Sequence, residues 1–293
     1  MLETISNCPI CESTSFKDYL DCTDYLVSGE TFSIQKCTNC RFLFTNPRPD
    51  QKSIVKYYKS NSYVSHSNKS NSPINVLYRI IRKHTLYQKL RMINKFSMQG
   101  SILDYGCGTG HFISHAQSKG WKVTGIEPDP NARKIAENSI GKDRLFYSLD
   151  QLEAETFNVI TLFHVLEHIH DLNQTISKLV DSLSDQGILI IAVPNHNSYD
   201  AQKYKAEWAA FDLPRHLYHF DNNSIPRLSQ KNGLKVVAQL PMYFDSYYVS
   251  MLSEQNRNNK LYPLKGIYSG LISNSKARKT KEYSSLIYVL QKK

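Results

Sequence analysis

The chain has 293 residues, which suits one large domain or a core domain with a small appendage. Hydrophobic residues make up 41% and charged residues 21%, a globular composition that argues against a mainly disordered, collagen-like or disulfide-knot protein. No apolar run approaches the roughly 20 residues of a membrane span, and the N-terminus lacks the apolar core of a signal peptide. We therefore expect a cytoplasmic protein whose six cysteines are ligands or buried thiols rather than disulfides.

The net charge of +10 is concentrated in two segments. Residues 73–98 contain six Lys and Arg, residues 255–281 contain seven, and neither segment contains an acid. Without these residues the chain would carry a small net negative charge. The two segments indicate an anionic partner, which could be nucleic acid, a phosphorylated small molecule or a membrane surface. A solvated helix face would explain residues 73–98 equally well.

Four cysteines in residues 1–49 have the spacing of a metal site. Cys8 and Cys11 form one C-x-x-C pair, and Cys37 and Cys40 form a second pair after 25 intervening residues. Four thiolates from two such turns can complete the tetrahedral shell of a structural Zn²⁺ ion, with no open position for water. We predict a zinc ribbon, because a segment of this size has a thin core that a metal would stabilise. The alternative is a metal-free remnant or a redox pair.

Residues 50–98 separate this module from the rest of the chain. Residues 50–72 are rich in Ser, Asn and Tyr, which predicts a linker or a flexible lid. Residues 73–98 begin with a proline and carry apolar residues at mixed spacings of three and four. This pattern predicts one or two basic amphipathic helices.

From residue 99 to residue 293, short apolar runs alternate with helical patterns. This order predicts βαβ units, a largely parallel sheet and a ligand at the carboxyl ends of the strands. The expected strands are 101–105, 122–126, 145–147, 157–163, 187–193, 236–240 and 285–290. The expected helices are 111–119, 130–138, 171–183 and 224–232, and the expected mobile loops are 256–259 and 273–280.

A glycine-rich loop follows the first of these strands. Gly106, Gly108 and Gly110 form a G-x-G-x-G pattern, which allows a tight turn and close approach of the backbone to a ligand. Nicotinamide and flavin binders instead use G-x-G-x-x-G. Asp104, two residues before the loop, would repel a pyrophosphate but could hold an ammonium group. Glu127, at the end of the second strand, can accept hydrogen bonds from both hydroxyls of a ribose.

Together these residues resemble the class I S-adenosylmethionine-dependent methyltransferases, over about residues 101–195 and more loosely over 285–290. The resemblance implies a Rossmann-like α/β fold with a seven-stranded, mostly parallel sheet and helices on both faces. It implies that Asp104 lies near the methionine part of S-adenosylmethionine, that the glycine loop wraps the cofactor, and that Glu127 binds the ribose. The further cofactor contacts that it implies are Cys107, Pro128, Leu149, Asp150 and His164. The alternative is a Rossmann-like fold with a dead or repurposed site.

The paired cysteines and the segment 42–49 are similar to the N-terminal module of many bacterial methyltransferases, among them deoxysugar C-methyltransferases. Those sugar enzymes typically have a further C-terminal lobe that is missing here, so the resemblance assigns no substrate. A zinc module with different ligand spacing also precedes this fold in a ribosomal-RNA guanine methyltransferase, which makes RNA the second candidate substrate.

Histidines after the fifth strand are the candidates for proton transfer. His216 and His219 lie in a region that commonly faces the substrate in this fold, and either could take a proton from the nucleophile during methyl transfer. We expect the two to share one face of a helical turn, with Arg215 available to hold an anionic substrate group. The alternative is a capped turn whose histidines bond backbone carbonyls. The histidines of residues 164–171 should form a pocket wall or a helix cap rather than a second metal site.

These patterns predict a methyltransferase with an N-terminal zinc ribbon that acts on a small or carrier-linked metabolite, with a sugar as one option. The methyl group would pass in line to a substrate oxygen, nitrogen or carbon while a histidine removes the proton. The first alternative is an RNA methyltransferase that grips phosphates with the ribbon and the basic faces. The second is a binding module without enzymatic activity, stabilised by zinc, that keeps a vestigial cofactor fold.

Overall fold

The computed structural model describes residues 1–58, 73–152 and 155–293, and in the helix that begins at Pro73 it describes side chains from residue 82 onward. The chain divides into two compact units. One comprises Met1–Val64, His164–Asn173 and Ala192–Tyr288, and the other comprises Ser65–Phe163, Gln174–Ile191 and Val289–Lys293. The units therefore interleave along the chain, and their boundaries do not coincide with residues 49 and 98.

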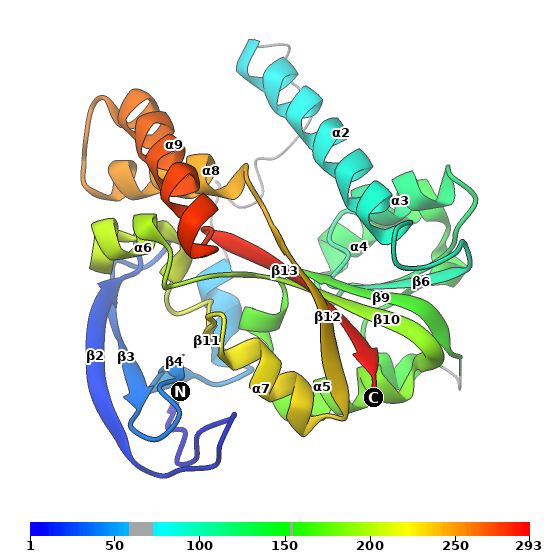
Figure 1. Ribbon diagram of the computed structural model, residues 1–293, viewed down its shortest axis with the longest axis horizontal. Coiled ribbons are helices and arrows are strands. Elements are labelled where there is room, and N and C mark those ends of the chain that lie inside the picture. Colours follow the sequence, from blue (N-terminus) through cyan, green and yellow to red (C-terminus); the bar gives the residue numbers. More distant parts are fainter. Residues whose placement is uncertain (59–72, 153–154) are drawn as a thin grey trace. The chain divides into compact units, whose positions relative to one another are not determined.

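A seven-stranded sheet forms the α/β core (Figure 1). Its strands are β6 (Ser101–Tyr105), β7 (Lys122–Ile126), β8 (Leu145–Phe146), β9 (Phe157–Phe163), β10 (Leu183–Pro194), β12 (Leu234–Pro241) and β13 (Ser285–Lys292). The strand order is β12-β13-β10-β9-β6-β7-β8, so the last strand of the chain lies between β12 and β10. β6 is parallel to both β7 and β9, and β7 is parallel to β8. The predicted fold class, an α/β protein with a mostly parallel seven-stranded sheet, is confirmed.

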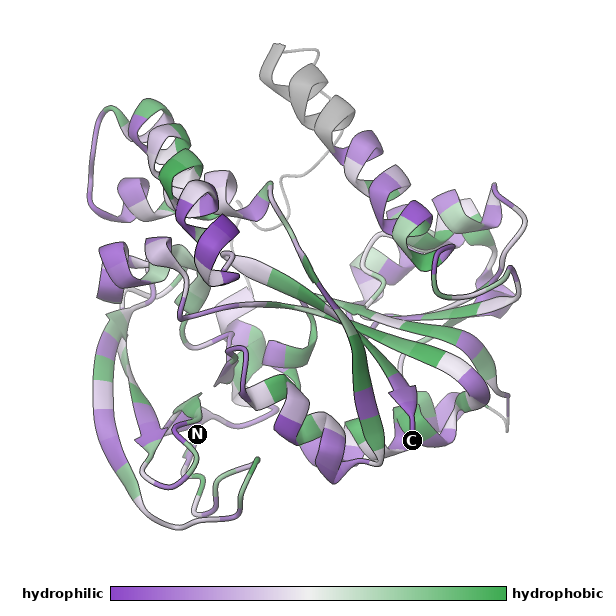
Figure 2. Ribbon diagram, in the orientation of Figure 1, coloured by the Kyte–Doolittle hydropathy of each residue, from purple (hydrophilic) through white to green (hydrophobic). Residues whose placement is uncertain are grey.

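The strands of this sheet are apolar along most of their length (Figure 2). In β10, every residue from Gly187 to Pro194 is buried. Continuous hydrophobic runs of this kind are typical of strands covered on both faces. β10 extends beyond the predicted 187–193 at both ends, and residues 184–186, which separate Leu183 from the apolar run, are polar.

The helices are α2 (Pro73–Ile93), α3 (His111–Gln117), α4 (Pro130–Ile140), α5 (Leu172–Asp181), α6 (Tyr199–Tyr204), α7 (Ser224–Lys231), α8 (Asp245–Asn256) and α9 (Tyr262–Thr280). Short 3₁₀ turns are η1 (Ser53–Tyr58), η2 (Lys142–Arg144), η3 (Leu149–Gln151), η4 (Leu166–His168), η5 (Lys205–Glu207) and η6 (Ala209–Phe211). α4 shows how local sequence sets the helix ends. The Asp129 side chain caps its first turn by accepting from the Ala132 N–H, and Gly141 follows its last residue with φ of 89°.

A second, antiparallel sheet contains the cysteine-bearing segment. Its strands are β2 (Phe16–Thr23), β3 (Thr31–Cys37), β4 (Leu43–Thr45) and β11 (Tyr218–His219), in the order β11-β4-β3-β2. A separate pair is formed by β1 (Leu2–Glu3) and β5 (Arg48–Pro49). Because β11 comes from the distant 212–220 segment, residues 1–49 do not form a self-contained sheet.

The predicted helical turn around His216 and His219 is wrong. Tyr218 pairs with Phe44 and His219 pairs with Leu43 in the antiparallel ladder between β11 and β4. The two-residue strand satisfies backbone groups that a helical turn would have bonded internally. Aromatic contacts reinforce this edge, since the Phe42 ring stacks on Tyr218 with centroids 6.1 Å apart.

The predicted loop at 273–280 is also wrong, because these residues form the last two turns of α9. The predicted loop at 256–259 falls at the end of α8 and in the connection to α9. No helix in the described part of the chain is long and apolar enough to cross a membrane.

Candidate functional site

The glycine loop after β6 has a backbone that only glycine adopts easily. All three loop glycines have positive φ, at 75°, 56° and 77°. A Cβ at Gly110 would lie 2.8 Å from the Cβ of Ala136, whereas a Cβ at Gly108 would meet nothing within 4 Å. The Cys107 N–H donates to the carbonyl of Ile126 at 2.9 Å, which fastens the loop to the end of β7. The loop is thus tightly turned, with open space at its middle glycine.

Glu127 follows β7 and is held by the loop. Its Oε2 accepts from the Gly108 N–H at 2.8 Å, and its Oε1 accepts from the Asp129 N–H at 2.9 Å. Burial raises the pKa of Glu127, and the two backbone N–H groups oppose that rise. The Arg133 guanidinium donates to the carbonyls of Glu127 and Pro128. Because a carboxylate offers about four acceptor positions, this arrangement leaves Glu127 able to accept hydrogen bonds from hydroxyl groups of a ligand.

Asp104 is 4% exposed and lies one residue before the end of β6. In the parallel ladder it pairs with Thr161 of β9, and the Thr161 hydroxyl donates to Asp104 Oδ1 at 2.6 Å. Burial raises the pKa of Asp104 to about 6, although Thr161 and the charge of Lys89 oppose the rise. The carboxylate is therefore a group that a ligand cation would return to its ionised form.

Three of the other predicted cofactor residues differ in their surroundings. The Cys107 thiol is buried, and burial raises its pKa, so the loop presents its backbone rather than this sulfur. Asp150 lies in η3 with its side chain 72% exposed and its Oδ1 2.6 Å from Lys178 Nζ. Leu149, the first residue of the same turn, is not buried.

His164 lies in the other compact unit, directly after β9, with φ of 58°. Its Nδ1 is 3.5 Å from Glu167 Oε1, and its Nε2 is 3.0 Å from Asp245 Oδ2. Burial alone would lower its pKa, but the two carboxylates outweigh burial and raise the pKa of His164 to about 10. His164 is thus an imidazolium ion between two carboxylates, and its predicted contact with the cofactor stays a prediction.

His168, His216 and Glu167 form a cluster in which Glu167 and His216 are buried and His168 is half-buried. The Nδ1 of His168 is 3.0 Å from the Arg215 carbonyl, and the Nδ1 of His216 is 2.9 Å from the Ala210 carbonyl. Since a carbonyl only accepts, we assign the Nδ1–H of each ring as the donor in these hydrogen bonds. Ligand atoms of the three residues lie within 4.8 Å of one another. The three side chains are therefore placed close enough together to hold a cation.

His219 is more constrained than His216. The Thr45 hydroxyl donates to the His216 carbonyl at 2.7 Å, so it has no second proton to give to His219 Nε2 at 3.2 Å. We therefore assign His219 Nε2–H as the donor to Thr45. Burial lowers the pKa of His219 well below its usual value, and its ring packs on Phe211 with centroids 5.2 Å apart. The Nε2 of His216 is less constrained, since the nearest carboxylate oxygen, from Asp212, is 3.9 Å away and beyond hydrogen-bond distance.

The expectation that Arg215 holds a substrate anion is wrong, because its guanidinium is fully used inside the protein. The side chain is 1% exposed. Its nitrogen atoms lie 2.8 Å from Asp24 Oδ1 and 2.7 Å from Asp212 Oδ1, and they also donate to the Tyr57 carbonyl at 2.9 Å. Arg215 instead joins the 212–216 segment to the loop between β2 and β3.

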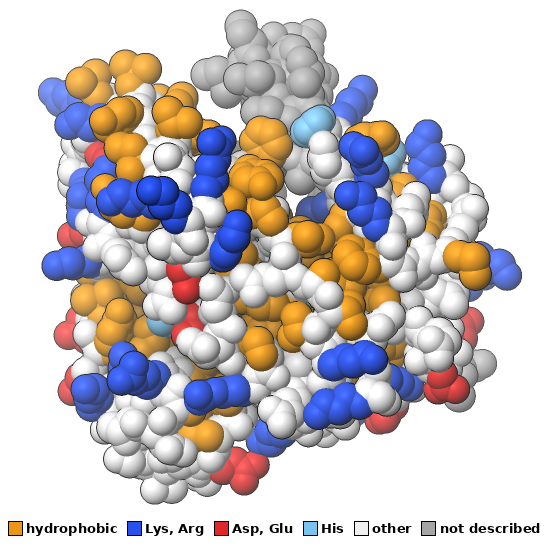
Figure 3. Space-filling view, in the orientation of Figure 1, with side chains coloured by type: hydrophobic (Ala, Val, Ile, Leu, Met, Phe, Trp, Pro, Cys, Tyr) orange, Lys and Arg blue, Asp and Glu red, His pale blue; other side chains and the backbone are white. Residues whose placement is uncertain are grey.

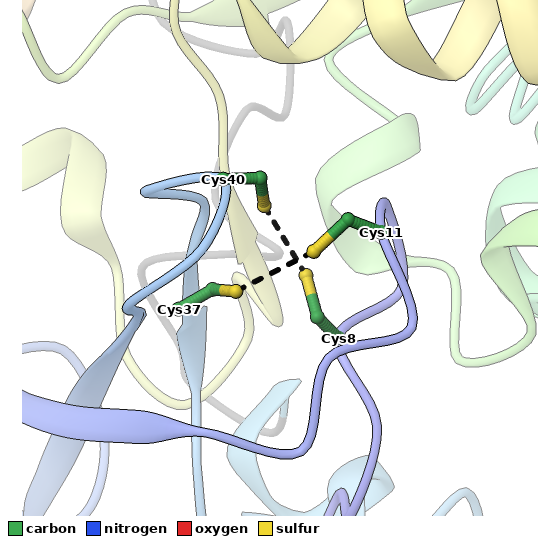
Figure 4. Close-up of side chains that lie close together, drawn as sticks. All are labelled: Cys8, Cys11, Cys37 and Cys40. Atoms are coloured by element: carbon green, nitrogen blue, oxygen red, sulfur yellow. Dashed lines mark hydrogen bonds between the residues drawn. The ribbon is translucent and has the colours of Figure 1, made fainter.

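The four cysteines predicted as metal ligands converge from two loops (Figure 4). The Sγ atoms of Cys8 and Cys40 are 3.5 Å apart, and those of Cys11 and Cys37 are 3.6 Å apart. Zn–S bonds of ~2.3 Å in a tetrahedron would set the sulfur atoms roughly 3.8 Å apart. None of the four is in a disulfide. The donor set and its spacing therefore fit a tetrahedral zinc ion.

Comparison with known families adds to this geometry. A family described as a methyltransferase domain matches residues 78–239, more than half of the chain. The chain belongs to this methyltransferase family. The match includes Asp104, the glycine loop, Glu127 and the histidine cluster, and it begins beyond the four cysteines.

Curated relatives of this methyltransferase align with part of it. The ubiquinone biosynthesis O-methyltransferase of Rhodopseudomonas palustris (strain TIE-1) is 28% identical over 148 residues, covering 46% of this chain and 58% of the relative. The enzyme of that name from Rickettsia bellii (strain OSU 85-389) is 28% identical over 181 residues, covering 54% and 75%. An uncharacterized methyltransferase of Alkaliphilus oremlandii (strain OhILAs) is 30% identical over 115 residues, covering 37% and 51%. The chain thus spans little more than half the length of the first of these relatives.

Solved structures share the fold at low identity. Magnesium protoporphyrin IX methyltransferase from Synechocystis PCC 6803, solved with bound SAH, has a TM-score of 0.54 and 14% identity, covering 83% of this chain and 100% of that chain. The StiE O-MT domain has a TM-score of 0.51 and 14% identity, covering 76% and 78%.

Four acidic or hydroxyl residues that lie at these sites in this methyltransferase were not predicted from the sequence: Thr161, Glu167, Asp212 and Asp245. Thr161 reaches Asp104 only through the register of two parallel strands, which no local pattern in the sequence fixes. Glu167 could have been predicted, since it is the one acid among the histidines of residues 164–170. Asp245 meets His164 across a separation of 81 residues, so its role depends on the tertiary fold.

Proposed function

We propose that this methyltransferase transfers a methyl group from S-adenosylmethionine to an oxygen atom of a small or carrier-linked acceptor, with a sugar as one option. The observation that carries the proposal is the Glu127 carboxylate, held by the Gly108 N–H at 2.8 Å beside a loop of left-handed glycines. The names of the ubiquinone biosynthesis O-methyltransferases support transfer to oxygen, and family membership supports the reaction class.

The residues of the second unit fit this donor. Asp104 is a buried carboxylate whose Oδ1 accepts from the Thr161 hydroxyl, and such a group suits the ammonium group of a methionine moiety. Glu127 has acceptor positions for the ribose hydroxyls, and the space at Gly108 admits a ligand against the backbone. When bound, S-adenosylmethionine supplies an electrophilic methyl group on its sulfonium. The chain's own contribution is to orient that group, because in-line positioning provides most of the acceleration in such a displacement.

We further propose that His216 is the base that removes the proton of the acceptor. Its Nδ1–H is fixed on the Ala210 carbonyl, so its Nε2 is the nitrogen able to take the proton. His219 is the weaker candidate, since its Nε2 is bonded to Thr45 and its pKa is strongly lowered. The proton would pass from the acceptor hydroxyl to Nε2 as the oxygen forms its bond to the methyl carbon, and the bond between that carbon and the sulfonium sulfur would break, leaving S-adenosylhomocysteine.

The four cysteines complete the proposal as a structural zinc site. A shell of four thiolates leaves no position for water or substrate, so the ion would stabilise the antiparallel sheet rather than take part in the reaction. β3 ends at Cys37, and β4 follows Cys40 after a short turn, so the ion would hold one end of this sheet.

An acceptor screen tests the reaction class. Purified protein is incubated with labelled S-adenosylmethionine and with phenols, nucleotide-linked sugars or a short structured RNA, and transfer of label is measured. The proposal predicts transfer to a small hydroxyl compound and its loss in Glu127→Ala. Transfer to RNA alone would replace the proposed acceptor class. Transfer to none of these compounds, by a protein that binds the donor, would contradict the proposal for the small hydroxyl compounds tested.

Paired histidine variants test the base. His216→Gln should lower the rate of methyl transfer by roughly 10²–10⁴-fold with unchanged affinity for the donor. His219→Gln is the matched control and should retain most of the rate. If His216 acts as a base, a chelator that leaves the cysteine-bound zinc in place should not change the rate of methyl transfer. A rate that requires added divalent metal would instead assign His168, His216 and Glu167 as metal ligands.

A further inference from the structure

The hairpin of α8 and α9 packs through small side chains. The buried positions of α9 are Gly266, Ser269, Gly270, Ser273, Asn274 and Ala277. A Cβ at Gly270 would lie 2.7 Å from the Cα of Tyr247, and one at Gly266 would overlap the backbone of Met251. The two glycines therefore let the backbones of α8 and α9 approach closely. The inner face of α9 is small and largely polar, unlike the inner face of an ordinary surface helix.

The outer face of α9 is apolar. Leu264, Ile267, Tyr268 and Leu271 have exposed fractions of 69%, 51%, 65% and 56%. Their spacing of three and four residues places them on one side of the helix, opposite the small residues. Leu261, just before the helix, is 57% exposed and extends the face. Figure 3 shows hydrophobic side chains gathered over this hairpin. The polarity of α9 is thus inverted, with its largest apolar side chains in solvent.

Basic residues lie beside and beyond this apolar face. Arg278 follows Leu271 by seven residues, two helical turns, so it continues the same side of α9, and Lys279 is next to it. Both are exposed, and the whole segment 255–281 contains seven Lys and Arg and no acid. Blue side chains flank the apolar area in Figure 3. An exposed apolar face rimmed by cations is complementary to an anionic lipid surface. The apolar side chains leave water there, and the cations are attracted to the anionic headgroups, so both contribute favourably to binding.

We propose that the α8–α9 hairpin binds the surface of an anionic lipid bilayer. Leu264, Ile267 and Leu271 enter the boundary between headgroups and acyl chains, and Arg278 and Lys279 contact the anionic headgroups. The hairpin lies in the plane of the interface, since no helix in the described residues has the length and apolarity to span a bilayer. This binding surface goes beyond the proposed function and does not depend on it.

Vesicle co-sedimentation tests the proposal with the whole chain. The probes are vesicles of phosphatidylcholine alone and vesicles in which about one quarter of the lipid is phosphatidylglycerol. The protein should sediment with the anionic vesicles and not with the neutral ones. Binding should weaken as salt is raised from low to physiological ionic strength, because screening reduces the attraction of the basic residues.

Matched variants distinguish binding through this surface from non-specific adsorption to the vesicles. Leu264→Glu with Leu271→Glu should reduce the partition coefficient by tenfold or more, whereas Ile135→Glu changes an apolar side chain on α4 that is 53% exposed and should have no effect. Arg278→Gln with Lys279→Gln should weaken binding by roughly fivefold for each charge removed. Lys142→Gln with Arg144→Gln, an exposed basic pair in η2, is the control for charge.

Two results would overturn the proposal. One is failure of the wild-type protein to bind anionic vesicles. The other is binding that the α9 variants leave unchanged while their circular dichroism and melting temperature match wild type. Analytical ultracentrifugation adds a decisive arm: a dimer that Leu264→Glu dissociates, in a protein that ignores vesicles, would assign the face to a second copy of the chain.

Discussion

At the scale of single residues, burial changes what the charged groups near the proposed donor site can do. Asp104 has little access to water and one hydroxyl partner, and its pKa is raised to about 6. An acid whose pKa is higher in the folded state favours the protonated form there. Its contribution to folding stability is therefore present at low pH and is lost as pH rises from about 4 to about 6.

The same shift predicts a pH dependence of donor binding. The ammonium group of S-adenosylmethionine needs the ionised form of Asp104, so affinity should fall by about tenfold for each pH unit below 6. Calorimetric titrations at pH 7 and pH 5 measure this loss. Asp104→Asn should bind weakly at both values, and equal pH dependence in this variant would assign the effect to another group.

Arg215 provides a second prediction at this scale. Its guanidinium neutralises Asp24, which is 1% exposed, so Arg215→Met would leave a buried carboxylate without its partner. Loss of one member of a buried ion pair costs about 3–5 kcal/mol of folding free energy. Urea unfolding measures the change. Lys178→Met, which removes an exposed partner of Asp150, should change stability by at most ~1 kcal/mol, and an equal effect of both variants would contradict the account.

At the scale of elements, the turn from β6 into α3 depends on Gly110. An alanine there would suffer backbone strain of roughly 1–2 kcal/mol from the positive φ, and its Cβ would meet Ala136 at 2.8 Å. Gly233 is the control, with φ of 69° and open space around a Cβ. Gly110→Ala should therefore lower the free energy of unfolding by about 1–3 kcal/mol more than Gly233→Ala. Denaturant titration compares them, and equal losses would show that the contact with Ala136 relaxes.

The elements that could be predicted from the sequence are those with strong local patterns. β6, β7 and β9 match their predicted bounds, because each is a short apolar run between helical or turn signals. β11 could not be found this way, since its two residues form a strand only by pairing with β4, more than 170 residues earlier. α9 was not predicted, because small residues face inward along it and the helix carries no apolar stripe toward the core.

The candidate site divides in the same way. Asp104, the glycines and Glu127 lie at or just after strand ends, where a ligand is expected in parallel sheets, and the structure brings these residues together. The four cysteines were predictable from spacing alone, and they converge. The roles of Thr161 and Asp245 were not predictable, since they depend on strand register and on packing between distant segments. Asp212 contacts Arg215 only three residues away, but the sequence does not fix the local turn that joins them.

At the scale of the whole molecule, the cysteine cluster and His219 belong to one antiparallel sheet. β4 pairs with β11 on one side and with β3, which ends at Cys37, on the other. Loss of a metal at the cysteines should therefore disturb the backbone around His219 as well as its own loops. Asp104, the glycine loop and Glu127, which we propose to bind the donor, belong to the other compact unit.

This arrangement predicts separate effects of zinc removal on catalysis and on donor binding. Mass spectrometry should find one zinc per chain, and Cys37→Ser should lose it. This variant should show faster hydrogen exchange at β11 and a lower rate of methyl transfer, with a smaller change in affinity for the donor. Cys22→Ala, which changes a buried cysteine outside the cluster, should keep its zinc. A wild-type chain without zinc would contradict the proposed site.

Donor binding is the central claim, and calorimetry of the zinc-replete protein with S-adenosylmethionine tests it most directly. The account predicts micromolar affinity that Asp104→Asn and Glu127→Gln each weaken by roughly tenfold or more, since a hydrogen bond to a charged group contributes ~1.5–3 kcal/mol. Asp143→Asn, an exposed acid in η2, should bind as wild type does. Absence of binding by a folded wild-type protein, or equal affinity in all three variants, would contradict the account.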